Sequence, residues 1–421
     1  MIQNNAPCYD RFLQDESGFR GNCRAIAFPA SSEEALETYR EMLRAGEPVT
    51  VQGSLTGLVG AAVPQGGYVL NTSRMNRVLD YIPTEHGAVI TVEPGMALSE
   101  LRREISARSG RERLFWPPDP TSVTASVGGI VMNRSAGLTA FRYGGCGEHI
   151  EEIHVVDYRG NERGGTAMAA PGELITSISL ILRPRPESLW GICFFLRDES
   201  AAGEFVEGMT RLRQTDREAT VATLEYMDRT VLSKMAEQQP SSPLRELPSI
   251  LRSAGGAVYT ELHGSADEVE SVLAQVLELS ERCGCAEADT WAGSDEIETA
   301  RIRSLRIAAS ETVHACAARD RSRYPSMTAL TANMNFTGED FGTVLKRFQA
   351  GAEEENLSCC IYGRADSSVY ATLLPETEEQ WQRGRALLRA WARDCRALGG
   401  RITGEFGTGK ITEDLYEGIL E

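Results

Sequence analysis

The pattern of apolar and polar residues predicts a strand-rich first part of the chain with two amphipathic helices. Apolar side chains share one face over 31–45, where Ser31 and Glu34 have the spacing of a capping box. A second helix is expected over 97–108. Short apolar runs bounded by Pro and Gly predict strands over 48–52, 67–73, 78–82, 88–93, 153–158 and 177–184.

The predicted helices and strands become longer after Pro184-Arg-Pro186, which we interpret as a domain boundary. Beyond it we expect helices over 201–214, 266–282, 296–318, 339–354 and 376–397, and strands over 257–263, 328–335, 357–363 and 368–374. Strands that alternate with helices of this length predict an open sheet with helices on one face, as in ferredoxin-like α+β domains. The last residues do not resemble a domain of their own. The expected parts are therefore 1–186, 187–400 and 401–421.

Charge and composition narrow the function classes. The 421 residues carry a formal net charge of −17 and no basic run, which disfavours nonspecific binding to nucleic acid or to an anionic membrane. No stretch approaches about 18 apolar residues, and the polar N-terminus lacks the order of a signal peptide. No two of the ten cysteines stand three apart, so buried, reduced thiols are expected rather than zinc or iron–sulfur ligands. These features predict a cytoplasmic globular protein.

Two glycine-rich segments are candidates for ligand binding. The segment 50–64 follows a predicted strand, and its glycines at 53, 57 and 60 let consecutive backbone N–H groups face one anion. An ordinary tight turn explains the same residues. No G-x-G-x-x-G opens a helix here, so a Rossmann site is not indicated. The segment 116–145 combines Pro-Pro-Asp-Pro, small hydroxylated residues and Gly128-Gly129, which suits backbone that lies flat against a planar ligand.

The stretch GEFGTGK at 404–410 has the letters of a phosphate-binding G-x-x-x-x-G-K loop. Its lysine is followed by Ile411 instead of the Ser or Thr that holds Mg²⁺. The eleven residues after it leave no room for the helix and sheet that such a loop opens. We therefore exclude a Walker A loop and expect Lys410 to be a solvated lysine of the tail.

Six motifs occur in an order that carries a family resemblance. They are FPASSEEALE (28–37), the loop around 53–60, LNTSRMNRV (70–78), VEPGMALSEL (92–101), PPDPTS…GGIVMN…RYG (117–144) and GGRITGEFGTG (399–409). Together they resemble the FAD-binding oxidoreductases of the glycolate oxidase and D-lactate dehydrogenase type, in the vanillyl-alcohol-oxidase-like superfamily. The resemblance implies an α+β fold with a two-subdomain PCMH-type FAD-binding domain, a ferredoxin-like α+β cap domain, and a C-terminal segment that returns to the FAD-binding part.

The resemblance also implies FAD as cofactor and assigns the residues that bind it. These are Gln52, Gly53, Ser54, Leu55, Thr56, Gly57 and Leu58 for the diphosphate, and Pro118, Asp119, Ser122, Gly128, Gly129 and Asn133 for the flavin. Leu55 stands where the family often has glycine, which puts the backbone freedom of this loop in doubt. The family's long loop beside the flavin is reduced here to 160–177, and only its end around Ile175 matches. One wall of the flavin site is therefore expected to be open to solvent or supplied by another chain.

The metal and base motifs of the family are altered. Arg364 and Tyr370 stand where two histidines bind a divalent metal in members that oxidise 2-hydroxy acids, and neither is a suitable ligand. The last of the five histidines is residue 314, so we expect no catalytic metal. Glu405 of the family's G-E-H-G-I-G pattern remains, whereas Phe406 replaces its histidine and cannot accept a proton.

Four residues stay as candidates for the reaction. Arg306 stands where the family places an arginine on the substrate carboxylate, although a helix-surface arginine is the other interpretation. Arg364 either replaces the metal in holding an anionic substrate or pairs with Glu405 in an inactive site. Tyr370 is either an acid–base group or a packed strand tyrosine, and Glu405 is the remaining catalytic carboxylate.

Two functions are compatible with these residues. One is a FAD-dependent oxidoreductase that acts on a small hydroxy acid or alcohol without a catalytic metal and passes electrons to an acceptor protein or partner subunit. The other is a degenerate, non-catalytic flavin-fold subunit that serves as a partner or scaffold in a larger redox enzyme. Neither involves nucleic acid or a membrane span.

Overall fold

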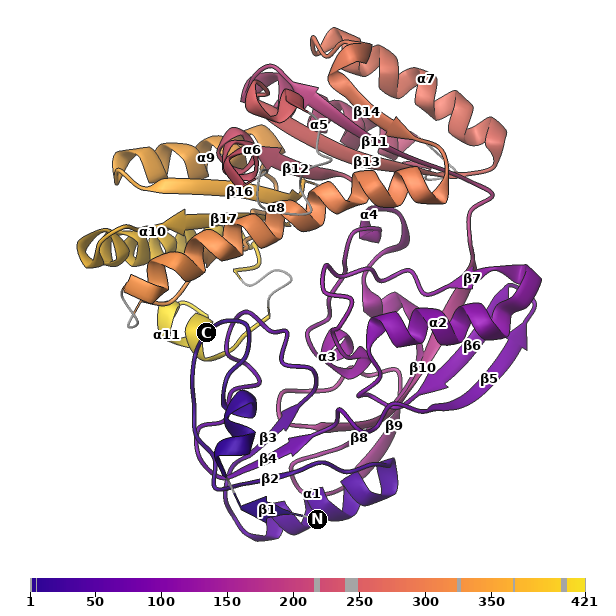
Figure 1. The fold of residues 1–421 in the computed structure, drawn as a ribbon, viewed down its shortest axis with the longest axis vertical. Helices are drawn as coiled ribbons and strands as arrows, with labels where there is room; N and C mark the ends of the chain where they lie inside the picture. The colour runs from indigo at the N-terminus through magenta and orange to yellow at the C-terminus, as the bar shows by residue number, and fades with distance from the viewer. Residues whose placement is uncertain are drawn as a thin grey trace. The chain divides into compact units, whose positions relative to one another are not determined.

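Three β-sheets organise the part of the chain that the computed structural model describes, namely residues 2–4, 6–215, 220–238, 249–323, 327–365, 368–402 and 407–420 (Figure 1). The chain divides into two units. The first comprises Met1–Arg185 and Glu405–Thr412, and the second comprises Pro186–Gly404 and Glu413–Glu421. Sheets and helices are mixed in both units, which confirms the predicted α+β class.

A mixed four-stranded sheet, ordered β1-β2-β4-β3, forms one part of the first unit. Its strands are β1 (Gln3–Asn4), β2 (Ala25–Ala27), β3 (Val49–Gln52) and β4 (Tyr68–Asn71). Helix α1 (Ser32–Arg44) buries Tyr39 and Met42 against this sheet. Ser31 caps the helix by accepting the Glu34 N–H at 3.2 Å, as predicted. The expected capping box is only half formed, because the Glu34 carboxylate accepts the Ala30 N–H at 2.9 Å.

A six-stranded antiparallel sheet forms the other part, ordered β5-β6-β10-β8-β9 with β7 paired to β10. Its strands are β5 (Val78–Thr84), β6 (Gly87–Val92), β7 (Leu114–Phe115), β8 (Ile150–Val156), β9 (Glu162–Gly165) and β10 (Leu174–Pro184). Helices α2 (Leu98–Ser109) and α3 (Val127–Met132) pack apolar residues into its core, and α4 (Ala140–Tyr143) follows them. Val156 and Leu174 of this sheet also join the core under α1. The two sheets of the first unit therefore share apolar contacts.

One seven-stranded antiparallel sheet, ordered β14-β11-β13-β12-β16-β17-β15, forms the second unit. Its strands are β11 (Ser188–Leu196), β12 (Glu225–Asp228), β13 (Gly256–Gly264), β14 (Thr290–Gly293), β15 (Leu330–Ala332), β16 (Ser358–Arg364) and β17 (Ser368–Leu374). Its helices are α5 (Glu199–Thr215), α6 (Arg229–Gln238), α7 (Ala266–Arg282), α8 (Glu296–Arg323), α9 (Phe341–Glu354) and α10 (Glu378–Ala397). The short α11 (Lys410–Leu415) begins in the part of the tail that belongs to the first unit.

Helices cover both faces of this sheet. Glu225 of β12 forms an ion pair with Arg306 of α8, whereas the next residue, Tyr226, packs edge-on against Phe341 of α9. Successive side chains of a strand point to opposite faces, so α8 and α9 lie on different sides. In Figure 1, α8 crosses the sheet as a long orange helix. The prediction of helices on one face only was therefore wrong.

Two sequence expectations concern the whole chain. All ten cysteines are free thiols, and all except Cys8 are buried, as predicted. Among the described helices, none has both the length and the hydrophobicity that a membrane span requires.

Candidate functional site

The predicted diphosphate loop begins where β3 ends, at Gln52. This side chain is buried, and its amide lies beneath the loop. Its Nε2 donates to the Phe12 carbonyl at 2.9 Å and to the Ala62 carbonyl at 2.7 Å. Gln52 therefore closes the loop on itself and joins it to the N-terminal segment. Asn71 supports the same end by donating to the Gly53 carbonyl at 3.1 Å.

The carbonyls of the loop are held from both ends of the chain. The N–H groups of Glu16 and Ser17 donate to the carbonyls of residues 55 and 57, each at 3.2 Å. From the C-terminal side, the Ile411 N–H donates to the carbonyl of residue 59 at 3.1 Å, and the Lys410 ammonium donates to the carbonyl of residue 61 at 2.9 Å. Every second carbonyl between 55 and 61 thus has a donor.

The N–H groups of the same loop are left available to a ligand. Between 53 and 62, all of which are described, the Gly60 N–H interacts with the Asp15 carboxylate. No other backbone N–H of this stretch donates to a described residue. A row of amide N–H groups without protein acceptors is the arrangement that binds a diphosphate.

Leu55 has the unusual backbone that its position in the sequence suggested. Its φ is 63°, in the left-handed region where glycine carries no steric cost. Its side chain packs against a small core that includes Phe12 and Leu13. Apolar contact with the N-terminal segment therefore compensates a strained backbone, and the loop keeps its shape without glycine at this position.

The second predicted cofactor segment meets the loop at one point. Ser126 caps α3 by accepting the Gly129 N–H at 3.3 Å, and a Cβ added to Gly53 would lie 2.1 Å from the Ser126 Oγ. Gly128 lies close to Pro94, because an added Cβ would be 2.7 Å from the Pro94 Cβ. Glycine is therefore required at 53 for the two segments to approach, and at 128 for α3 to pack against Pro94.

The other predicted flavin residues lie on either side of α3. Asp119 is bound by Arg102 at 2.5 Å, and its carbonyl accepts the Leu138 N–H at 3.0 Å. Pro118 is buried beside it, and the Ser122 Oγ lies 3.0 Å from that of Thr124. Asn133 ends α3.

The tail returns to the loop and to Asn133. An added Cβ on Gly407 would lie 3.5 Å from the Asn133 Oδ1, and one on Gly409 would lie 2.4 Å from the Val59 carbonyl oxygen. Lys410 is half-buried and bound to the loop, so the expectation of a solvated tail lysine was wrong. Glu405 and Phe406 lie outside the described residues.

A buried acid, which the sequence did not point to, lies under the loop. Asp15 is 7% exposed, its Oδ1 accepts the Ser17 N–H at 3.1 Å, and its Oδ2 has no hydrogen-bond partner among the described residues. A Cβ added to Gly57 would lie 3.4 Å from that oxygen. Burial raises the pKa of Asp15 above its usual value. The pKa of neighbouring Glu16 is also raised, by burial and then by the Asp15 charge.

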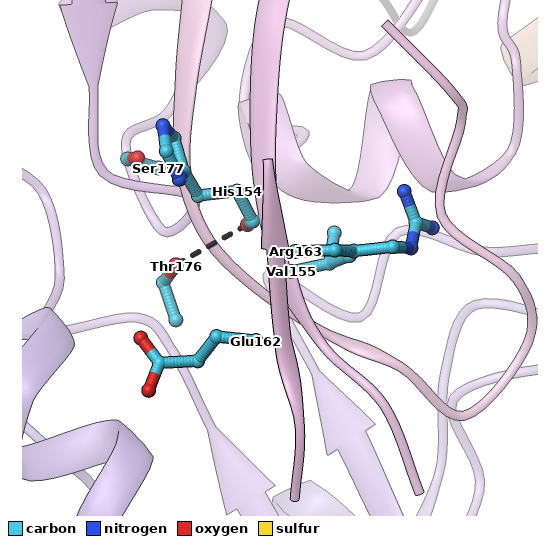
Figure 2. Close-up of a pocket in the computed structure, with 6 residues that line it drawn as sticks. All are labelled: His154, Val155, Glu162, Arg163, Thr176 and Ser177. Carbon is cyan, nitrogen blue, oxygen red and sulfur yellow. Dashed lines mark hydrogen bonds between the residues drawn. The ribbon is translucent and has the colours of Figure 1, made fainter. Parts of the chain in front are cut away.

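Ile175 does not line the loop with its side chain. It is a core residue of β10, 4% exposed, at a bulge between residues 175 and 177. A hollow of about 220 Å³ lies beside this bulge, and Figure 2 shows the side chains that line it. Its lining residues are His154, Val155, Glu162, Arg163, Thr176 and Ser177. None of them is a predicted cofactor residue, so we assign no cofactor role to this hollow.

The substrate candidates of the second unit share one sheet face. Glu225 and Arg364 are directly opposite on β12 and β16, so their side chains lie on the same side. Arg306 reaches this face from α8, and its Nε lies 3.3 Å from the Glu225 Oε2. Glu225 and Arg364 are buried at 4% and 8% exposure. Glu225, Arg306 and Arg364 thus lie on the face of the sheet that α8 covers.

Tyr370 belongs to the same face. It lies on β17, directly opposite Tyr362 of β16, and the two ring centroids are 5.3 Å apart. Tyr362 precedes Arg364 by two residues, which places Arg364 and both tyrosines on one side of the sheet. The structure therefore brings Arg306, Arg364 and Tyr370 to one face of this sheet.

A charged network on β13 was missed by the sequence reasoning. Glu261 is fully buried and receives two hydrogen bonds of 2.7 Å from Arg303 of α8. His263 lies 2.9 Å from the second carboxylate oxygen, and the Tyr259 hydroxyl donates to the first. The Arg303 charge and the His263 contact hold the pKa of Glu261 well below its usual range despite burial. Alternating polar residues at 259, 261 and 263 were the available signal, because they mark a polar strand face.

The described residues contain no group of three or more His, Cys, Asp or Glu side chains placed to hold a metal ion.

Comparison with known proteins identifies the family. Residues 23–163 match the family described as FAD binding domain, and residues 202–418, about half of the chain, match FAD linked oxidases, C-terminal domain. The chain therefore belongs to the FAD-linked oxidases and is an FAD-linked oxidoreductase by family. Its cofactor is FAD, and the residues present fit it, because the loop offers unpaired N–H groups and glycine where side chains would collide.

Three relatives show the range of the similarity. The glycolate oxidase subunit GlcD of Bacillus subtilis is 23% identical, over 88% of this chain and 77% of that protein. The mitochondrial D-lactate dehydrogenase [cytochrome] of Arabidopsis thaliana is 24% identical, over 91% of this chain and 66% of that protein. A D-lactate dehydrogenase of Anaerostipes hadrus is 31% identical, but over only 34% of this chain and 30% of that protein.

Solved structures with the same fold are more distant in sequence. p-Cresol methylhydroxylase with substrate bound has a TM-score of 0.70 at 14% identity, over 98% of this chain and 87% of that one. The 4-ethylphenol oxidase of Gulosibacter chungangensis has a TM-score of 0.71 at 15% identity, over 100% of this chain and 89% of that one. These similarities confirm the predicted fold alone.

Gly53→Ala should weaken FAD binding and lower the free energy of unfolding by about 1–3 kcal/mol, because the new methyl group collides with the Ser126 cap. FAD titration by flavin fluorescence and urea unfolding of the cofactor-free protein measure the two effects. Gly203→Ala is the control, since the nearest atom to its added Cβ is 3.9 Å away inside α5. It should keep FAD affinity and stabilise by at most about 1 kcal/mol. Equal effects of both substitutions would contradict the close approach at Gly53.

Asp15→Asn should change how stability depends on pH. The folded state holds the Asp15 proton more tightly than the unfolded state, whose pKa is near 3.8, so wild-type stability falls as pH rises from about 4 through the folded-state pKa. The variant should lack the decrease in stability that the ionisation of Asp15 causes. Its stability relative to wild type should therefore increase as pH rises. Urea unfolding between about pH 4 and 8 measures the difference, with exposed Asp10→Asn as control. A difference that does not change with pH would show that Asp15 titrates as a solvated acid.

Proposed function

We propose that this protein is a metal-free FAD-dependent dehydrogenase for a small 2-hydroxy acid or related alcohol. The observation that carries the proposal is the group of Arg306, Arg364 and Glu225 beneath α8, which lies among the residues predicted for the substrate. A guanidinium binds a carboxylate through two parallel hydrogen bonds, and its charge is worth most where water is excluded. A buried surface with two guanidinium groups suits an anionic substrate.

Each candidate residue has a separate task in this proposal. Arg306 and Arg364 hold the substrate carboxylate, with Glu225 fixing the position of Arg306. The Tyr370 hydroxyl exchanges a proton with the substrate hydroxyl, and Glu405 is retained as a candidate carboxylate although its position is not described. The bound flavin supplies the acceptor for the hydride.

Arginine replaces the metal in this scheme. A divalent ion and a guanidinium both neutralise a carboxylate, but arginine stays protonated and needs no ligand set. The names of the relatives support the substrate class, since they include glycolate oxidase, D-lactate dehydrogenase and D-2-hydroxyglutarate dehydrogenase. The word subunit in the first name supports an acceptor protein or partner chain. We retain the cytoplasm as the proposed location.

The ion pair between Arg306 and Glu225 favours a second candidate function. At 3.3 Å, the Glu225 carboxylate already occupies one side of the guanidinium that a substrate would need. If it is not displaced, the face is a structural charge network, and the protein is a non-catalytic FAD-binding or scaffold subunit of a larger redox enzyme.

Anaerobic spectrophotometry should distinguish the two functions. The purified protein should show the absorption bands of oxidised flavin, and one or more D-2-hydroxy acids should bleach them at a rate that EDTA does not change. Arg364→Met should raise the substrate concentration for half-maximal bleaching at least about tenfold, because a charged hydrogen bond to the carboxylate is lost. Arg301→Met, on the exposed side of the same helix as Arg306, is the matched control and should leave it unchanged.

Three results would contradict parts of the proposal. Loss of bleaching in EDTA would show that a metal takes part. Bound flavin that no hydroxy acid or alcohol reduces would favour the non-catalytic subunit. Equal effects of the Arg364 and Arg301 substitutions would remove the polar face from substrate binding.

A further inference from the structure

A buried carboxylate lies against the middle of the predicted diphosphate loop. Asp15 is 7% exposed, and a Cβ added to Gly57 would lie 3.4 Å from its Oδ2. The Gly60 N–H interacts with the same carboxylate and stabilises its charged form. Asp15 therefore contacts the stretch of backbone whose N–H groups we assign to the diphosphate of FAD.

The two oxygens of Asp15 have different surroundings. Oδ1 accepts the Ser17 N–H at 3.1 Å, and the Ser17 hydroxyl donates to it as well. Oδ2, the oxygen beside Gly57, has no hydrogen-bond partner among the described residues. A buried carboxylate oxygen without a partner is costly when charged, whereas a protonated one is a donor. Oδ1 thus anchors the side chain, and Oδ2 can gain a proton without breaking that anchor.

The backbone next to Asp15 is bound to the loop. The N–H groups of Glu16 and Ser17 donate to the carbonyls of residues 55 and 57, each at 3.2 Å. These two bonds flank the loop residues that the carboxylate contacts. Together with the contacts of Ser17 to Oδ1, they hold the carboxylate against the loop when a ligand binds.

Few charged groups of the described residues surround Asp15. Residues 50–64 contain no charged side chain. The N-terminal segment contributes Glu16, which is more exposed, and the tail contributes Lys410, whose ammonium donates to a carbonyl of the loop at 2.9 Å. Burial is the largest influence on the pKa of Asp15 and raises it. The Asp15 carboxylate is therefore close to the condition in which an added negative charge makes it take up a proton.

A diphosphate on this loop supplies such a charge. It carries about two negative charges, and two anions that share a few donors in a partly buried site cannot both stay charged at low cost. The diphosphate of FAD is esterified at both ends, so it lacks the ionisation near pH 6 that a terminal phosphate has. The carboxylate is the group that can change its charge.

We propose that Asp15 takes up one proton from solvent when the diphosphate of FAD binds to the loop, so that FAD affinity depends on the protonation of this acid. Ionised Asp15 is then a competitor within the chain, because it uses the backbone N–H side that the diphosphate needs. The inference rests on FAD as the cofactor and on the predicted loop as its diphosphate site, and it is independent of the substrate.

The affinity for FAD should fall as pH rises. FAD favours the protonated form of Asp15, so the Kd should increase between the pKa of Asp15 in the free protein and its pKa in the complex. The limit for one proton is about tenfold per pH unit. Flavin fluorescence titrations between about pH 5 and 9 measure this change. ADP-ribose as a competitor should show the same dependence, because its diphosphate is also esterified at both ends.

Replacing the acid by its neutral isostere should remove this dependence. Asp15→Asn should bind FAD with the same Kd across the range, and at about pH 9 it should bind at least about tenfold more tightly than wild type. A residue that only supports the loop would instead weaken binding when it is changed. Asp10→Asn removes an exposed acid of the same segment and is the control, which should keep the wild-type dependence.

Proton uptake can also be measured on the unmodified protein. Titration calorimetry with FAD in two buffers of different ionisation enthalpy gives the number of protons bound per FAD. The wild-type protein should take up a measurable fraction of one proton at a pH between the two pKa values of Asp15. Asp15→Asn should take up none.

Each other outcome counts against a specific statement. A wild-type Kd that does not change with pH, without proton uptake, would overturn the inference while leaving FAD as the cofactor. Weaker binding by Asp15→Asn at every pH would overturn it too. If Glu16→Gln removed the pH dependence and Asp15→Asn did not, the proton would belong to the more exposed acid, and the inference would be wrong. A wild-type protein that binds no FAD would overturn the proposed function and this inference together.

Discussion

The shape of the predicted diphosphate loop depends on hydrogen bonds to its carbonyl groups. Carbonyls at 55, 57, 59 and 61 accept hydrogen bonds from residues near the two ends of the chain. Among the N–H groups between them, only that of Gly60 has an acceptor in the described residues, the Asp15 carboxylate. Backbone N–H and C=O groups that are buried or half-buried need hydrogen-bond partners. Because the protein supplies donors to the carbonyls, it is the N–H groups of the loop that remain for a ligand. Gln52 and Leu55 then hold the shape, one through hydrogen bonds and the other through apolar contact. This arrangement suits an anion, and it uses neither a helix dipole nor a Rossmann turn.

The second unit contains charged side chains that are buried in the fold. On the face of the sheet under α8, Glu225 and Glu261 each receive an arginine from that helix. Burial penalises the charged form of a carboxylate, and at Glu261 the Arg303 fork and His263 outweigh that penalty. Such a face costs more to assemble than an apolar one of the same area, so it is typical of a site that must receive a polar ligand. The same argument admits a purely structural network, which is why substrate binding needs its own test.

Predictions from local pattern succeeded where one segment determined its own structure. Helix α1 follows from its apolar spacing and the Ser31 cap, and β16 and β17 from runs that are apolar and short. Strand β11 was missed because SLWGICFFL is a continuous apolar run without alternation, and β12 because four residues carry little periodicity. The helices were expected on one face because spacing along the chain does not report which side of a sheet a helix crosses.

The sequence by itself determined the family and the fold class, and it predicted the segments that we propose for the cofactor. These are recorded in residue types that cannot vary freely, such as the glycines at 53 and 128, where any side chain would collide. Only the tertiary structure decided what Asp15 and Lys410 do, because each acts on a loop far from it in sequence. The energy of a charged side chain depends on its burial and on the groups around it, and the sequence alone does not give either. For that reason the lysine of GEFGTGK looks like an ordinary tail residue in the sequence, whereas in the folded chain it donates to the Ala61 carbonyl.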